Sequence, residues 1–293
     1  MGCAAPGTGM ARDNRSEPGG GAGQGSQVEL GRETLGALSA ASTATLQTQL
    51  FSLGLRNTFV FGLRPLDPGS ARFVGEAFTL RYIPAREDLD VLTAFQDPAH
   101  PQRLAIESVG PGQVLVMDCR GQGRAASAGH ILATRLRRRG AVALVTDGSV
   151  RDSPQIRRMG FPVFTSAVSA TTNLVLHHAV DVQVPIGCGG VPVYPGDVLV
   201  GDEEGVVVIP RHLAARIAQP AAEQEELERF ILGRIQEGAA LPGTYPPDEA
   251  TLAAFRAARE ATHGKGSAHG AVPGPPPRDA ESAQPDHGGG RSA

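Results

Sequence analysis

The residues whose side chains are best suited to binding or catalysis are Arg151 and Asp152, which follow an apolar stretch and a glycine turn over residues 142–150. A guanidinium is a planar set of donors suited to a substrate carboxylate, and an aspartate is a hard oxygen ligand suited to a divalent cation. Held side by side at a sheet edge, the two groups would polarise a 2-oxo acid. The alternative for an isolated Arg-Asp dipeptide is a surface ion pair.

Several other residues compete for a functional role. His177 and His178 are adjacent, a spacing that points two side chains apart on a helix or strand, so we interpret them as structural. Asp118 and Asp147 lie at the ends of predicted parallel strands, where ligands gather, but capping or turn roles are equally open. Residues 187–190 look like a phosphate-binding loop, yet no helix with a Lys-Ser/Thr pair follows. We therefore predict a tight β turn there.

A strand-helix-strand unit must position Arg151 and Asp152. Residues 113–119 are a continuous apolar run, typical of a strand covered on both faces. Residues 128–139 have helical spacing, with Gly140 as the expected C-cap, and residues 141–147 are a second buried strand. This order predicts a βαβ crossover and parallel pairing.

The remaining pattern predicts a mixed α/β core with a barrel-like β region. Helices are expected within residues 33–55, 155–160 and 213–237. Strands are expected at residues 58–63, 73–83, 161–165, 181–186, 190–194, 198–201 and 205–209. The glycine-rich and proline-rich ends, residues 1–27 and 264–293, are predicted to be disordered because they cannot bury enough apolar surface.

Composition excludes several classes of protein. A net charge of −3 and a pI near 6.2 give no electrostatic case for nucleic acid or an anionic membrane as partner. Three cysteines without paired spacing argue against a disulfide framework and against a Cys-based metal site. No secretory signal and no long apolar run is evident. We expect a cytoplasmic protein.

The motifs resemble one known family, that of the regulator of ribonuclease E activity and the class II 4-hydroxy-4-methyl-2-oxoglutarate aldolases. The similarity rests on Gly129 upstream of Arg151-Asp152, on the strand end TDGSVRD, and on VPVYPGD followed by GDEEGVVVIP at residues 191–210. The resemblance spans roughly residues 33–247. It implies a swivelling β/β/α domain over residues 28–247, a C-terminal helix over residues 248–263, and a homotrimer or hexamer with active sites between subunits.

The resemblance also implies a site. Arg151 would hold the pyruvate carboxylate, and Asp152 would be the direct ligand of Mg²⁺ or Mn²⁺. The substrate would face the backbone N–H groups of a helix N-terminus, which attract anions because they are unpaired. That helix start comprises Gly129, His130, Ile131 and Leu132. An acidic residue of a neighbouring subunit would support the metal, with Asp202, Glu203 or Glu204 as the candidates.

His130 departs from the aldolase pattern, which places Asp at this position, 21 residues before Arg151. That carboxylate orients metal-bound water in the aldolases. Histidine can itself carry a proton near neutral pH or bind a metal, but it brings no negative charge. His130 is thus either a third catalytic residue beside Arg151 and Asp152 or a surface residue at a helix start.

Two functions follow as hypotheses. The first is a metal-dependent lyase that cleaves a 4-hydroxy-2-oxo acid to pyruvate and decarboxylates oxaloacetate as a side activity, because both reactions pass through the same enolate. The second is a non-catalytic regulator that binds ribonucleases or other RNA-processing proteins. The second function needs a partner-facing surface and no metal.

Overall fold

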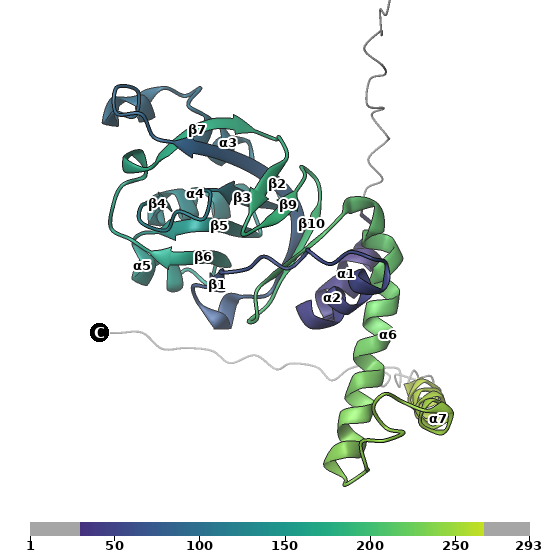
Figure 1. Cartoon of the computed structure of the whole chain (residues 1–293). Coiled ribbons are helices and arrows are strands. Elements are labelled where there is room, and N and C mark those ends of the chain that lie inside the picture. The colour runs from purple at the N-terminus through teal and green to yellow at the C-terminus, as the bar shows by residue number, and fades with distance from the viewer. Residues whose placement is uncertain (1–29, 267–293) are drawn as a thin grey trace, which may run out of the picture. The chain divides into compact units, whose positions relative to one another are not determined.

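The computed structural model describes residues 30–266, with side chains described to residue 261 (Figure 1). The predicted disordered segment 1–27 lies outside the described residues, as does nearly all of 264–293. The described chain forms two compact units, which divide after Ala222. The domain boundaries expected at residues 247 and 263 stay predictions.

A nine-stranded mixed sheet dominates the first unit and curls into a half-barrel (Figure 1). Its order is β1-β6-β5-β3-β2-β10-β11, with β4 beside β5 and β7 beside β2. The strands are β1 (Arg64–Pro65), β2 (Phe73–Pro84), β3 (Gln113–Asp118), β4 (Ala126–Ala128), β5 (Ala143–Val150), β6 (Val163–Val168), β7 (His177–Val182), β10 (Val198–Gly201) and β11 (Val206–Ile209). A separate hairpin joins β8 (Ile186–Cys188) to β9 (Val191–Val193).

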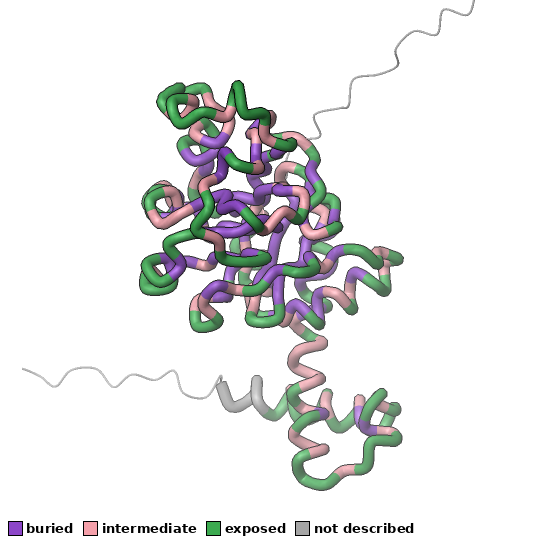
Figure 2. Tube along the Cα trace, turned by 60° about the vertical axis from the view of Figure 1, so that its left-hand side comes forward, coloured by how far each residue is buried: buried purple, intermediate pink, exposed green. Residues whose placement is uncertain are grey.

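The centre of the sheet is parallel, as the strand-helix-strand pattern predicts. β2, β3, β5 and β6 pair in parallel, and β10, β11, β7 and β1 add antiparallel edges. Every residue of β5 is buried, because both faces of the sheet are covered. Figure 2 shows the buried residues concentrated along these strands.

Helices complete the first unit. α1 (Arg32–Ala40) and α2 (Thr43–Ser52) precede the sheet, and α3 (Pro101–Ser108), α4 (His130–Arg139) and α5 (Ser153–Arg157) connect its strands, together with the short 3₁₀ helices η1 (Pro68–Ser70), η2 (Leu92–Gln96) and η3 (Asn173–Val175). Leu136 of α4 packs with Leu115 and Leu144 in one apolar cluster. Leu38 and Leu46, from α1 and α2, pack against β10 and β11 in another. Helices thus cover one face of the central strands and the outer side of β10 and β11, while the β8–β9 hairpin packs on the other face of β3 and β5.

The second unit contains the end of α6 (Arg211–Gln236) and α7 (Glu249–Gly266). Within it, the rings of Phe230 and Phe255 lie 5.6 Å apart, and Arg259 pairs with Glu223 and Glu226. α7 continues to Gly266, three residues past the predicted end of the C-terminal helix. No helix in residues 30–266 is long and apolar enough to cross a membrane.

The structure corrects several element boundaries. Residues 58–63 form no strand, only an isolated bridge at Phe59, and the strand expected at residues 181–186 is instead β7. The helix predicted from residue 128 begins at His130, because residues 126–128 are strand β4, paired with β5. Gly189 and Gly190 form the predicted tight turn, between β8 and β9, and Gly187 lies in β8.

Candidate functional site

β5 delivers Arg151 and Asp152 to the edge of the sheet. The strand runs to Val150, so both residues follow directly on its end. Asp152 has a left-handed backbone, with φ 57° and ψ 32°, which Asp tolerates better than most residues. Its carboxylate makes no capping hydrogen bond to its own helix α5. The carboxylate instead accepts a hydrogen bond from the backbone N–H of His130, at the start of α4, at 3.2 Å.

Gly129, the N-cap of α4, makes this arrangement possible. A Cβ at this position would lie 2.7 Å from Asp152 Oδ2 and 3.0 Å from Arg151 Cγ. The glycine has an extended backbone with φ −133°, so the requirement is for space rather than for a left-handed conformation. Because Gly129 has no side chain to cap α4, the Asp152 carboxylate supplies the missing acceptor.

The Arg151 guanidinium is available to a ligand. Its backbone N–H bonds to Ala128 O at 3.0 Å, which fixes the main chain beside β4. Its Nε lies 3.8 Å from Asp152 Oδ2, beyond hydrogen-bonding distance, and 48% of the side chain is exposed. Arg151 and Asp152 therefore form a loose, half-exposed ion pair at a cavity, so the surface-pair alternative also fits this contact.

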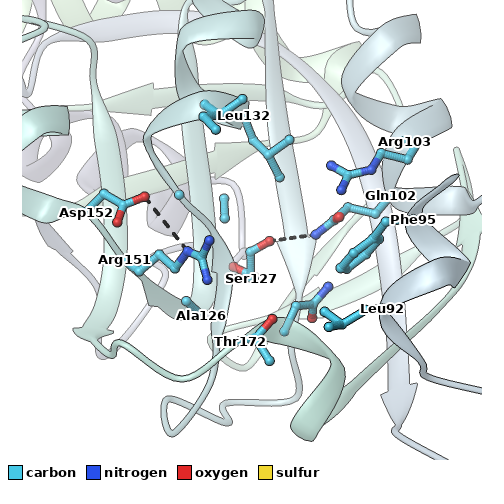
Figure 3. Close-up of a pocket in the computed structure, with 14 residues that line it drawn as sticks. Leu92, Phe95, Gln102, Arg103, Ala126, Ser127, Leu132, Arg151, Asp152 and Thr172 are labelled. Carbon is cyan, nitrogen blue, oxygen red and sulfur yellow. Dashed lines mark hydrogen bonds and ion pairs between the residues drawn. The ribbon is translucent and has the colours of Figure 1, made fainter.

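Arg151 and Asp152 form one side of a cavity of about 340 Å³ (Figure 3). The wall contains Gly129, Ile131 and Leu132 of the predicted site, and residues from α3, η2 and η3 that the motifs do not indicate. These additional residues are Leu92, Phe95, Gln102, Arg103, Thr172 and Asn173. The structure therefore brings together the predicted residues and adds a second wall.

His130 takes part through its backbone. Its N–H contacts Asp152, whereas its imidazole is not among the groups that line the cavity. The first N–H groups of an α-helix have no acceptor within the helix, so the start of α4 presents donors beside Arg151. The hypothesis that the His130 side chain carries a proton stays a prediction.

A buried polar chain underlies the cavity. Gln102 Nε2 donates to Tyr82 Oη at 3.2 Å and to Ser127 O at 2.8 Å. The Ser127 hydroxyl lies 3.0 Å from the Thr146 hydroxyl, which lies 3.4 Å from Cys119 Sγ. Burial raises the pKa of the Cys119 thiol to about 12, so this cysteine is neutral near pH 7.

The strand-end aspartates serve as backbone acceptors. Asp147 accepts hydrogen bonds from the N–H groups of Cys119, Gly121 and Gly189, at 2.6–3.3 Å. Burial raises its pKa, and these three donors oppose that effect. Asp118 accepts from Arg120 N at 2.9 Å in the same way. Both aspartates therefore stabilise turns by accepting backbone hydrogen bonds, which is one of the two roles that the sequence left open.

The adjacent histidines point apart, as their spacing predicts. His177 is buried, packs at a tilt against the Tyr82 ring with centroids 5.5 Å apart, and donates from Nε2 to Ala125 O at 3.3 Å. Burial lowers its pKa. His178 turns to the other side of β7 and contacts Asp90 Oδ1 at 2.9 Å. Both histidines are structural.

The three candidate acids lie apart from Arg151, in a second cavity with Arg72. Asp202 accepts hydrogen bonds from Thr43 N and Oγ1 at 2.7 and 2.8 Å, and so anchors the start of α2. Glu203 and Glu204 are exposed. Support of a neighbouring subunit's metal by one of these residues stays a prediction.

Comparison with known proteins defines the family. A family model named RraA-like, described as Aldolase/RraA, matches residues 43–208. The chain belongs to the RraA-like family, and the resemblance seen in the motifs is confirmed. The expected swivelling β/β/α fold with a mixed sheet is confirmed as well, because solved members of the family share it.

Individual relatives carry two kinds of name. A putative 4-hydroxy-4-methyl-2-oxoglutarate aldolase of Halalkalibacterium halodurans is 33% identical over 177 residues, covering 58% of this chain and 76% of the relative. A 4-hydroxy-4-methyl-2-oxoglutarate aldolase of Thermus thermophilus is 34% identical over 143 residues, covering 48% and 78%. The solved structure of RraAS2 of Streptomyces coelicolor, called an unusual member of the RNase ES inhibitor RraA family, has a TM-score of 0.61 and 32% identity, covering 68% and 96%.

Proposed function

We propose that this protein is a divalent-metal-dependent lyase that cleaves 4-hydroxy-4-methyl-2-oxoglutarate, or a related 4-hydroxy-2-oxo acid, to pyruvate. The observation that carries the proposal is the cavity in which the half-exposed guanidinium of Arg151, the carboxylate of Asp152 and the start of α4 converge. These three groups can bind a carboxylate, a cation and a developing negative charge. The aldolase names of the relatives support the same reaction.

The donor set at Asp152 fits a weakly held cation. Residues 30–266 contain no cluster of three or more His, Cys, Asp or Glu side chains arranged around a metal. Mg²⁺, however, is commonly held by one or two carboxylates with water and substrate oxygens. Asp152 would supply that carboxylate while also accepting the hydrogen bond from His130 N. When bound, Mg²⁺ or Mn²⁺ would supply Lewis-acid polarisation of the 2-oxo group.

The chain's own groups have separable roles. Arg151 binds the carboxylate next to the 2-oxo group through its planar donors, and so orients the bond between C3 and C4. As that bond breaks, its electron pair moves into the pyruvyl half as an enolate, the 4-hydroxyl gives its proton to solvent water, and solvent then returns a proton to C3 to complete pyruvate. The N–H groups at the start of α4 stabilise the oxygen on which negative charge grows. Oxaloacetate decarboxylation would use the same groups, with carbon dioxide leaving in place of the second carbonyl product.

A second candidate function is a non-catalytic regulator of RNA processing. The likeness to RraAS2 favours it, as does His130 in the position of the aldolases' Asp. Either function fits a homotrimer or hexamer, which we propose for the assembly on the family resemblance.

Pyruvate release tests the lyase. Purified protein is assayed with 4-hydroxy-4-methyl-2-oxoglutarate and with oxaloacetate, with and without MgCl₂ or MnCl₂. Asp152→Ala should abolish the metal-stimulated rate, whereas Asp88→Ala, at an exposed surface pair with Arg86, should not change it. Full metal-stimulated turnover by Asp152→Ala would contradict the assignment. Absence of turnover, together with absence of pyruvate or oxalate binding by calorimetry, would favour the regulator.

A further inference from the structure

Arg103 is an arginine without a counter-ion beside the cavity. It lies on α3, half-buried, and among residues 30–266 its guanidinium forms neither an ion pair nor a hydrogen bond. Arg135 on the neighbouring helix α4 behaves differently, because it binds the Glu107 carboxylate through two nitrogens. Partial burial of an unpaired guanidinium is unfavourable. Such a group is therefore ready to receive an anion.

The Phe95 ring fixes the orientation of this guanidinium. Arg103 Cζ lies 4.4 Å from the ring centroid, a stacking distance. Stacking leaves the N–H edges of the guanidinium open for a carboxylate in bidentate geometry. Figure 3 shows Arg103, Phe95 and Gln102 on one wall of the cavity and Arg151 with Asp152 on the other. Two guanidinium groups therefore border the cavity from opposite walls.

Three amide atoms of two buried side chains in the same cavity lack a hydrogen-bond partner of good geometry. Gln102 is 2% exposed and its Oε1 accepts no hydrogen bond, while Asn173 is 5% exposed and neither of its amide atoms has a partner of good geometry. Buried polar groups are rarely left in this state in native proteins. Both residues line the cavity. Their free donor and acceptor atoms indicate a polar ligand next to Arg103.

We propose that Arg103 is a specificity-determining residue, an inference that rests on the proposed function. Arg103 binds a second carboxylate, at the far end of the 2-oxo acid whose first carboxylate is held by Arg151. Asn173 Nδ2 is a free donor in the cavity lining that can bind a carboxylate oxygen, whereas Gln102 Oε1 is an acceptor suited to a hydroxyl, such as the 4-hydroxyl of the proposed substrate. The site therefore selects 2-oxo dicarboxylates over 2-oxo monocarboxylates of the same length.

Calorimetric titration tests this selection independently of turnover. The probes are 2-oxoglutarate and 2-oxopentanoate, which have equal chain lengths but differ in the far carboxylate, each titrated with MgCl₂ present. Arg103→Gln should raise the Kd of 2-oxoglutarate roughly 10- to 100-fold, the usual effect of losing a charged hydrogen bond, and leave that of 2-oxopentanoate unchanged. Arg103→Lys should retain part of the preference, because it keeps the charge without the planar donors. Arg138→Gln, an exposed α4 arginine outside the cavity lining, is the matched control.

The outcomes separate this inference from the proposed function. If the wild type binds 2-oxoglutarate more tightly than 2-oxopentanoate and Arg103→Gln loses this preference, the role of Arg103 is supported. Equal binding of the two acids by the wild type, or an unchanged preference in both Arg103 variants, contradicts that role alone. A wild type that binds neither acid contradicts the proposed function, and this inference with it.

Discussion

The substitution Gly129→Ala tests whether the positions of Arg151 and Asp152 determine function. The added Cβ would lie 2.7 Å from Asp152 Oδ2, whereas ordinary van der Waals contact begins near 3.4 Å. The carboxylate must therefore retreat by about 0.7 Å, and Arg151, with Cγ at 3.0 Å, must move with it. The extended backbone at residue 129 accepts alanine, so the perturbation is confined to these two side chains.

The expected effect on activity exceeds the effect on stability. A misplacement of about 1 Å can lower a rate by about 10²-fold, so we expect kcat/KM for pyruvate release to fall roughly 10- to 100-fold. Replacing an N-cap glycine by alanine costs about 1 kcal/mol of unfolding free energy, which is small against a typical total of roughly 5–15 kcal/mol. The variant should therefore fold and bind pyruvate weakly.

The assay compares Gly129→Ala with Gly36→Ala. Gly36 lies in α1, and no atom lies within 4 Å of the position that a Cβ would occupy, so alanine there should leave activity unchanged and stabilise the helix by about 0.5–1 kcal/mol. Pyruvate release and the Kd of pyruvate are measured for both variants, and thermal unfolding verifies folding. Wild-type kcat/KM and wild-type pyruvate affinity in Gly129→Ala would refute the reasoning.

Three further predictions use the same structure. His130→Ala should leave kcat and the pH-rate profile for pyruvate release unchanged, because the imidazole does not line the cavity; an altered profile would show that His130 carries a proton. Burial lowers the pKa of His177 in the folded state, so the unfolded chain binds a proton there at higher pH than the folded chain does. The free energy of unfolding should therefore fall as pH drops below about 6.5, by at most about 1.4 kcal/mol per pH unit. His177→Gln should reduce that slope in denaturant titrations between pH 5 and 8, and an identical slope would assign the effect to other groups. Asp202→Ala removes the acceptor of Thr43 N and Oγ1 and should destabilise the protein by about 1–2 kcal/mol in thermal unfolding, whereas Glu203→Ala, at an exposed residue, should not.

The local pattern of apolar residues and glycine was sufficient to predict the strand-helix-strand unit. Continuous apolar runs predict strands covered on both faces, and β3 and β5 are buried in the centre of the sheet. Gly140 ends α4 in a left-handed conformation with φ 90°, the geometry for which glycine is preferred. These signals depend on neighbours in sequence, so the position of Arg151 and Asp152 at a strand end could be predicted.

Strand boundaries that depend on a partner were predicted less well. Residues 58–63 are apolar, but a strand needs a neighbour, and only Phe59 bridges to Val207. β7 begins at His177 rather than at residue 181, because the backbone from His177 onward pairs with β2. The His177 imidazole is buried against Tyr82. The sequence alone does not show that a histidine will be buried.

The sequence by itself determined the family, the parallel pairing of β3 with β5 and one half of the candidate site, because the start of α4 lies within this crossover unit and Arg151 and Asp152 directly follow it. Tertiary structure alone decided the other half. Arg103, Phe95 and Asn173 belong to separate short elements with no shared motif, and they meet only in the cavity, where α3 packs against α4 and β7 and η3 packs against β4. Periodicity reports which face of an element is buried, whereas the side chains that share a cavity are set by the packing of elements distant in sequence.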